Sequence, residues 1–314
     1  MTAHALLSAS GAHRWMNCPG SVEATKDATR TTSVFAEEGT LAHRICELAL
    51  SANMTCVDVL KASTIKAELA RLNIDQAAAK VMAEHCQTYV DYVSALREKE
   101  VSSFFEVRVD FSPWVPDGFG TADAIIIKDR VMHICDLKFG AGVYVDVKMN
   151  PQLMLYALGA INDFGWAHEI DRIKMAVIQP RMDNISEWET TAEELGLWAQ
   201  KTHLAAMRAL EPGAPRIPGE KQCRWCEAKA TCGALAKLTS DTLMSDFDNL
   251  EDGLTPANTL SVEQLGSALR NKALITAWLT AVEDHIKARI AEDGAFPGFK
   301  VVEGRSNRAW SDNV

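Results

Sequence analysis

The sequence predicts an α/β fold in which a mixed central sheet is flanked by helices, with helical additions and a short cysteine-rich knuckle. One observation is the order of apolar segments, in which helical spacing alternates with short runs rich in β-branched residues. Another is the composition of the 314-residue chain, 47% hydrophobic and 24% charged, which is typical of a globular protein with a sizeable core and one accessory region. A third is that acidic and basic side chains stand at the ends of the expected strands.

The expected elements follow one another in a clear order. They are a helix at 41–51, a helix at 74–98, strands at 104–111, 122–128 and 131–137, a helix at 151–164, a strand at 172–179 and a helix at 192–210. Turn residues 113–118 separate the first two strands. Pro151 opens a helix, where its missing N–H costs nothing, and Pro180 ends the last strand. Helix, three strands, helix and strand therefore form the expected core.

The C-terminal part has a different residue pattern from the rest of the chain. An acidic segment at 241–260 predicts a linker, and 261–292 predicts one amphipathic helix that packs within the chain. Its expected core positions are Leu265, Leu269, Ala273, Leu274, Trp278 and Val282. We therefore expect a main domain at 1–240, the linker at 241–260, and a helix with a basic tail at 261–314. The tail has no closing element, so truncation of the chain stays open.

The stretch Asp136-Leu137-Lys138 closes an expected strand. Side chains alternate along a strand, so Asp136 and Lys138 share one face. A turn at 128–130 would pair this strand with the preceding one and bring Asp123 beside Asp136. Two carboxylates suit a hard divalent cation such as Mg²⁺ or Mn²⁺, and a lysine can orient water or stabilise charge in phosphodiester hydrolysis. The alternative is an ordinary solvated strand end.

Two helical pairs accompany these residues. His43 and Glu47 lie four residues apart on one helix face, and so do Gln152 and Tyr156 on another. Taken alone, His43 is interpreted as a packed or solvated helix residue. Gln152 and Tyr156 are likewise interpreted as ordinary helix residues. It is their order around the two carboxylates and the lysine that makes them candidates.

The ordered set GTLAHRICE, GTAD, DLK and QLMLY resembles the RecB-like branch of the PD-(D/E)XK nucleases. The resemblance implies a restriction-endonuclease-like core and a metal-dependent DNA exonuclease of phage recombination or DNA end processing. It implies the following roles: metal ligation by His43, Asp123, Asp136 and the Leu137 carbonyl; catalysis by Lys138, with Glu47 as a supporting or second-metal group; and DNA contact by Gln152 and Tyr156. Ala122 stands where the family name has proline, at a position that varies in this branch.

The cysteines give an independent signal. Cys223, Cys226 and Cys232 form a C-x2-C-x5-C pattern in a polar segment, which is typical of a metal or cluster knuckle. Zinc and an iron-sulfur cluster both suit such thiolates. The pattern resembles that of AddB-type and CRISPR-adaptation nucleases, which implies a 4Fe-4S cluster with Cys18 as fourth ligand. The remaining cysteines are expected in the core: Cys46, Cys56, Cys86 and Cys135.

Charge and targeting signals limit the remaining choices. The formal net charge of −10 predicts that any DNA contact is confined to a local basic face. We expect a cytoplasmic protein, in the host cytoplasm if phage-encoded, because neither an apolar signal run nor a membrane-length apolar segment occurs. DNA is the expected partner, with a single-strand annealing or binding protein by analogy, and the oligomeric state stays open. The alternatives are a non-catalytic DNA-binding or assembly protein and a zinc-knuckle regulatory protein.

Overall fold

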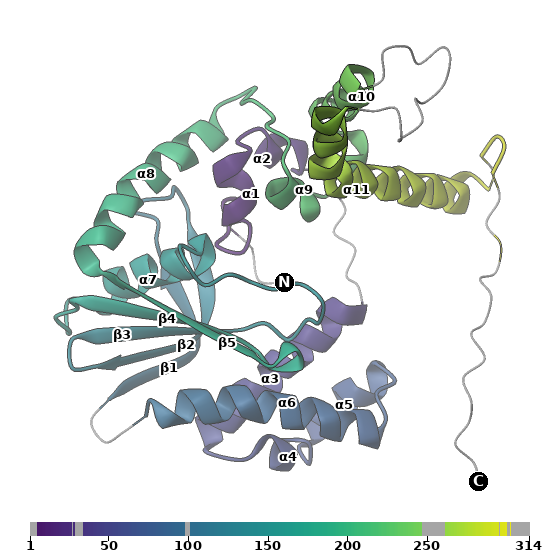
Figure 1. Ribbon diagram of the computed structural model, residues 1–314. Coiled ribbons are helices and arrows are strands. Elements are labelled where there is room, and N and C mark those ends of the chain that lie inside the picture. Colours follow the sequence, from purple (N-terminus) through teal and green to yellow (C-terminus); the bar gives the residue numbers. More distant parts are fainter. Residues whose placement is uncertain are drawn as a thin grey trace, which may run out of the picture. The chain divides into compact units, whose positions relative to one another are not determined.

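The computed structural model describes residues 5–26, 28, 34–97, 101–246, 261–294, 296–299 and 302. The chain divides into two compact units, Met1–Arg216 and Ile217–Val314 (Figure 1). Most of the expected linker, residues 247–260, lies outside the described residues, whereas 241–246 belong to a helix. In the part of the chain that is described, no helix has both the length and the hydropathy of a membrane span.

The first unit is built on a five-stranded mixed sheet in the order β1-β2-β3-β4-β5. The strands are β1 (Ser102–Asp110), β2 (Phe119–Lys128), β3 (Val131–Leu137), β4 (Arg172–Gln179) and β5 (Asn184–Thr191). Only the β3–β4 pair is parallel. This confirms the α/β class and the mixed sheet. The edge strand β5, whose alternate side chains are exposed, was not predicted.

The hairpin between β2 and β3 is confirmed. The two strands pair from Ala124 opposite Cys135 to Lys128 opposite Val131. The turn residues Asp129 and Arg130 have φ values of 48° and 64°. Positive φ at both central residues gives a turn whose twist matches that of the flanking strands.

Helices cover both faces of this sheet (Figure 1). One face packs on α1 (Ala12–Asn17), α7 (Pro151–Phe164) and α8 (Ala192–Leu210). The other packs on α3 (Val34–Ala52), α4 (Cys56–Val59), α5 (Ser63–Arg71) and α6 (Gln76–Ala95). Two short elements complete the unit, α2 (Ser21–Ala24) and η1 (Pro180–Met182). The helix expected at 41–51 is longer than predicted, while α7 and α8 have the predicted bounds. Glu98, the expected end of α6, lies outside the described residues.

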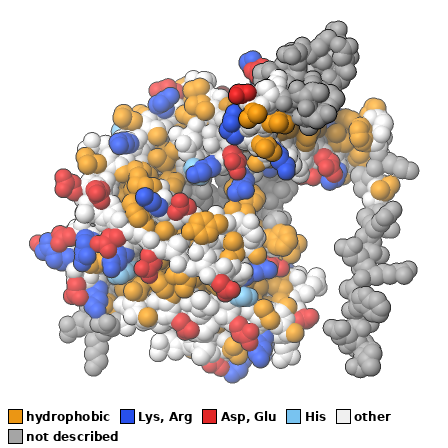
Figure 2. Space-filling model, viewed as in Figure 1, with side chains coloured by type: hydrophobic (Ala, Val, Ile, Leu, Met, Phe, Trp, Pro, Cys, Tyr) orange, Lys and Arg blue, Asp and Glu red, His pale blue; other side chains and the backbone are white. Residues whose placement is uncertain are grey.

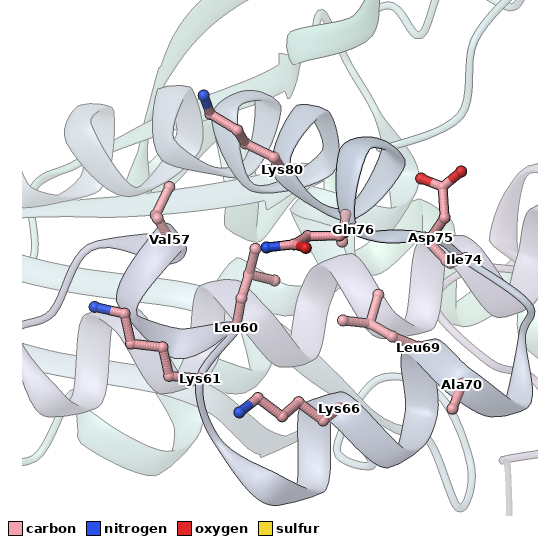
Figure 3. A pocket seen from close by; sticks show the side chains of 11 residues that line it. Val57, Leu60, Lys61, Lys66, Leu69, Ala70, Ile74, Asp75, Gln76 and Lys80 are labelled. Atoms are coloured by element: carbon pink, nitrogen blue, oxygen red, sulfur yellow. The ribbon is translucent and has the colours of Figure 1, made fainter.

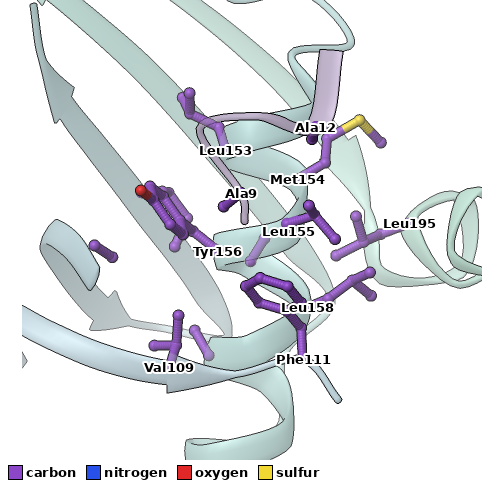
Figure 4. Packing of buried hydrophobic residues seen from close by; sticks show 14 of the residues in the cluster. Ala9, Ala12, Val109, Phe111, Leu153, Met154, Leu155, Tyr156, Leu158 and Leu195 are labelled. Carbon is purple, nitrogen blue, oxygen red and sulfur yellow. The ribbon is translucent and has the colours of Figure 1, made fainter. Parts of the chain in front are cut away.

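The buried face of α7 forms the centre of one core (Figure 4). The helix begins at Asn150, whose Oδ1 accepts from the N–H groups of Gln152 and Leu153 at 3.0 and 3.4 Å. Pro151 follows in the first turn. An N-cap of this kind satisfies donors that have no partner within the helix. The start of α7, and hence the position of Gln152, is thereby fixed.

The second unit contains α9 (Glu220–Arg224), η2 (Lys229–Thr231), α10 (Gly233–Asp246) and α11 (Val262–Asp293). Its small core joins Cys223, Leu235 and Leu274. The helix α11 packs on α9, η2 and α10, so packing within the chain is confirmed. The expected apolar stripe is partly wrong, because Leu265, Leu269 and Ala273 are exposed. The stripe over-predicts burial because this small unit covers only part of a 32-residue helix.

Candidate metal centre

Asp123 stands between the end of β3 and helix α3. Its Oδ2 accepts a hydrogen bond from the backbone N–H of Leu137 at 2.7 Å. Its Oδ1 lies 3.3 Å from Nδ1 of His43. The expected pairing of β2 with β3 therefore places this carboxylate at the end of β3, and each of its oxygens has a separate contact.

His43 is positioned by the buried face of α3. Leu41, Ala42 and Ile45 pack into the core, so the imidazole is directed to the sheet end. Its Nδ1 is also 3.5 Å from Oε1 of Glu106. Burial lowers the pKa of His43, but Asp123 and Glu106 outweigh burial and raise the pKa to about 10. Without a cation, a proton on the imidazole balances the two acids.

Glu106 is the site residue that the sequence analysis missed. One donor atom each from His43, Glu106 and Asp123 lies within 4.8 Å of the others. Glu106 lies in β1 with φ of 44°. It is left out of the register between the pairs Phe105–Ala124 and Val107–Ala122. A non-glycine residue with this backbone conformation is strained and is common at functional sites. The available signal was an acidic residue inside an apolar strand, which alternation alone assigns to a solvated face.

The buried Asp136 and the half-buried Lys138 form an ion pair at the end of β3. Asp136 is 1% exposed. Its Oδ1 accepts from Lys138 Nζ at 3.2 Å, and its Oδ2 is 2.8 Å from the same ammonium. Burial raises the pKa of the Asp136 carboxyl, against the lowering effect of Lys138. Burial lowers the pKa of Lys138, but Asp136 and Asp123 outweigh it and raise that pKa. The predicted shared face of these two residues is confirmed.

The predicted α7 pair extends this network. Lys138 Nζ donates to Gln152 Oε1 at 3.0 Å, and Gln152 Nε2 donates to the Tyr156 hydroxyl at 3.0 Å. Gly120 makes room for the tyrosine, because a Cβ there would lie 2.7 Å from Tyr156 Cε1. The glycine of the GTAD segment is thus explained by close packing.

Two predicted residues are less directly involved. Glu47 accepts a hydrogen bond from Arg44 at 2.8 Å, one helical turn after His43, and stands outside the group of three donors. Leu137 contributes its backbone N–H to Asp123. Ligation by its carbonyl remains a prediction, as does a metal role for Glu47.

The donor set fits a hard divalent cation. The group of three combines an imidazole with the carboxylates of Glu106 and Asp123, and oxygen-rich sets of this kind suit Mg²⁺ and Mn²⁺. Asp136 stands outside this group but interacts electrostatically with Asp123 and His43. Asp136 Oδ2 is buried without a well-aligned hydrogen bond. The Lys138 ammonium lies 2.8 Å from this oxygen, so a cation bound there would share the carboxylate with the lysine.

The cysteines separate into two groups. Cys46, Cys56, Cys86 and Cys135 are buried in the apolar core, as predicted. In the first unit, Cys18 is buried directly after α1. In the second, Cys223 and Cys226 are buried and Cys232 is half-buried. Gly219 donates its N–H to Cys223 Sγ at 3.4 Å. A metal at these thiols remains a prediction.

A hollow of about 630 Å³ lies among α4, α5 and α6 (Figure 3), and its lining contains none of the candidate site residues. Acidic and basic side chains are interspersed on the face drawn in Figure 2. This face therefore carries no broad basic surface, in keeping with the net charge of −10.

The fold and the site define a class: an α/β protein with a mixed sheet, in which a histidine of α3, acidic residues of β1, β2 and β3 and the lysine after β3 are close to one another. The family model described as "Protein of unknown function (DUF2800)" matches residues 4–314. The chain therefore belongs to the DUF2800 family.

Proposed function

We propose that this protein is a metal-dependent deoxyribonuclease with a restriction-endonuclease-like core. The observation that carries the proposal is the convergence of His43, Asp123, Asp136 and Lys138 at one end of the sheet. These residues come from separated segments, and apolar packing alone gives no reason for burying two acids beside an amine. Exonuclease action in phage recombination or DNA end processing, with a single-strand annealing protein as partner, follows from the motif resemblance.

Each side chain has a distinct task in this proposal. His43, Asp123 and Asp136 hold Mg²⁺ or Mn²⁺, and Glu106 adds a fourth side-chain donor. The bound cation would supply charge stabilisation at the phosphate and a more acidic water. Lys138 positions the attacking water, and its hydrogen bond to Gln152 keeps the ammonium oriented. Gln152 and Tyr156 contact the strand beside the scissile phosphate.

The direct test compares D136N and K138A with the unaltered protein. Mn²⁺-dependent digestion of end-labelled DNA should fall by roughly a hundred-fold or more in each variant, the scale of losing one preorganised electrostatic group. EDTA should stop digestion by the unaltered protein. D171N and K174A are matched controls, because both residues form ion pairs on the exposed sheet surface.

Circular dichroism should show that both site variants fold. Retention of full activity by D136N and K138A would refute the catalytic assignment. Metal-independent DNA binding without digestion by the unaltered protein would instead favour a non-catalytic DNA-binding role.

We further propose that the cysteines carry a structural 4Fe-4S cluster. The C-x2-C-x5-C spacing supports it, and the motif resemblance gives Cys18 as the fourth ligand. Zinc is the competing metal for the same donors. The cluster would stabilise the fold and take no part in hydrolysis.

A further inference from the structure

The segment 139–150 between β3 and α7 has no regular secondary structure, yet hydrogen bonds hold it in place. Gln179 at the end of β4 is 1% exposed, and its amide faces this segment. Its Nε2 donates to the Val143 carbonyl at 2.9 Å, and its Oε1 accepts from the Val145 N–H at 2.9 Å. The Oε1 also accepts from Asn184 at 3.1 Å. A buried amide satisfied in this way fixes the backbone on both sides of Tyr144.

The fixed segment lies beside the catalytic lysine of the proposed site. The N–H of Lys138 donates to the carbonyl of Ile178 at 2.9 Å, and Gln179 is the next residue on β4. Neighbouring strands lie about 4.8 Å apart, so the backbone held by Gln179 is close to the start of Lys138.

Tyr144 points out of the segment. Exposure alternates from 143 to 147: Val143 and Val145 are half-buried, Val147 is 4% exposed, and Tyr144 is 58% exposed. Alternation of this kind directs the valines inward and the aromatic ring outward. The ring thus faces solvent on a backbone held by hydrogen bonds on both sides, and such preorganisation lowers the entropic cost of binding a flat partner.

Met149 is a second exposed large hydrophobic residue on this segment. It is 49% exposed and has φ of 54°, directly before the Asn150 cap of α7. A left-handed backbone at a non-glycine residue costs free energy and is retained where function requires it. Two apolar side chains are therefore exposed on the segment that links Lys138 to Gln152.

We propose that Tyr144 stacks on an unpaired base of single-stranded DNA next to the scissile phosphate. This rests on the proposed nuclease function and adds a substrate class to it, an unpaired strand at the site. Aromatic rings stack on bases with little sequence preference, because every base has a π-face. Binding through one ring also needs no broad basic surface, which agrees with the acidic net charge of −10.

The test measures binding separately from cleavage. Fluorescein-labelled oligothymidylate of about a dozen nucleotides is titrated with the full chain in EDTA, and fluorescence anisotropy gives the affinity. Y144A should weaken binding about ten-fold, the scale of losing one stacked base, while Y144F should bind normally. W166A is the matched control, because Trp166 is an exposed aromatic (87%) beyond the other end of α7. An unchanged melting temperature in Y144A would show that the loss is local.

A second oligonucleotide, which contains abasic sites, tests whether Tyr144 contacts a base. An oligomer with abasic sites should bind the unaltered protein about as weakly as oligothymidylate binds Y144A, and Y144A should bind both strands alike. Equal affinity of Y144A and unaltered protein, tighter binding of duplex or RNA than of single-stranded DNA, or no preference for bases over abasic sites would each overturn the proposal. Failure of the nuclease proposal shows separately, as absence of digestion with Mn²⁺.

Discussion

Asp123 shows how single atoms organise the site. One oxygen accepts the Leu137 N–H at 2.7 Å, and the other faces His43 at 3.3 Å. A carboxylate held by a backbone donor cannot rotate freely, so its second oxygen is preorganised. Asp136 is fixed differently, by burial and by the Lys138 ammonium. The two acids therefore differ in environment although both come from adjacent strands.

The titration of His43 predicts a pH dependence of stability. Its pKa is raised from 6.5 to about 10 in the folded metal-free protein. A raised folded-state pKa contributes stability that is complete below about pH 6.5 and is lost as the pH rises toward 10. In EDTA, the free energy of unfolding of the unaltered protein should exceed that of H43N at pH 6 and approach it near pH 10. Urea titrations at several pH values measure this, and a constant difference contradicts it.

Substitutions of Glu106 should change Mn²⁺ binding and the stability of the fold in different ways. E106Q and E106G should both bind Mn²⁺ more weakly, as isothermal titration would show. In EDTA, however, E106G should resist urea better than E106Q. At positive φ a side chain costs roughly 1 to 2 kcal/mol, and glycine avoids this cost. Ordering the more flexible glycine backbone costs only about 0.5 to 1 kcal/mol, so the net effect of glycine is stabilising. If E106Q is the more stable variant, the backbone at 106 is not strained.

The sequence predicted the residues that occur in recognisable spacings and missed the one that does not. Asp136 and Lys138 follow from strand alternation, and Gln152 and Tyr156 from helical spacing. Glu106 reaches the site only because β1 leaves regular geometry there. A periodic pattern cannot signal a local departure from periodicity.

At the scale of elements, apolar content decided which strands could be predicted. β3 and β4 are buried on both faces and were predicted at their observed bounds. β5 has the sequence NISEWETT and exposes alternate residues at the edge of the sheet. Edge strands bury little apolar surface, so composition distinguishes them poorly from loops.

Two glycines in helices predict opposite effects of the same substitution. A Cβ at Gly159 in α7 would lie 2.9 Å from Val109 Cβ and 3.2 Å from that residue's backbone carbon. G159A should therefore destabilise the fold by about 1 to 3 kcal/mol through overpacking. A Cβ at Gly196 in α8 would meet no atom within 4 Å. G196A should stabilise by about 0.5 to 1 kcal/mol through helix propensity.

Thermal or urea unfolding of both variants measures these changes. A stabilised G159A would show that α7 can move away from β1 at little cost. A destabilised G196A would contradict the open environment of that position.

At the scale of the whole molecule, the proposed cluster at the cysteines leads to a prediction about iron content and stability. If the cluster proposal holds, anaerobically purified protein should be brown and contain iron, and C226S should lose both the colour and part of its thermal stability. C86A is the matched control, because Cys86 is buried in the other apolar cluster and should leave the colour unchanged. Zinc in place of iron, or full colour in C226S, would contradict the proposal.

The close packing of Gly120 against Tyr156 should couple these two positions during evolution. A methyl group at 120 would lie 2.7 Å from the ring, so the strand glycine and the helix tyrosine form one steric unit. Lineages that exchange the glycine must shrink or shift the aromatic residue in the same step, and the two positions should drift together. The coupling would persist in descendants that have lost every acid of the centre, because it depends on volume alone.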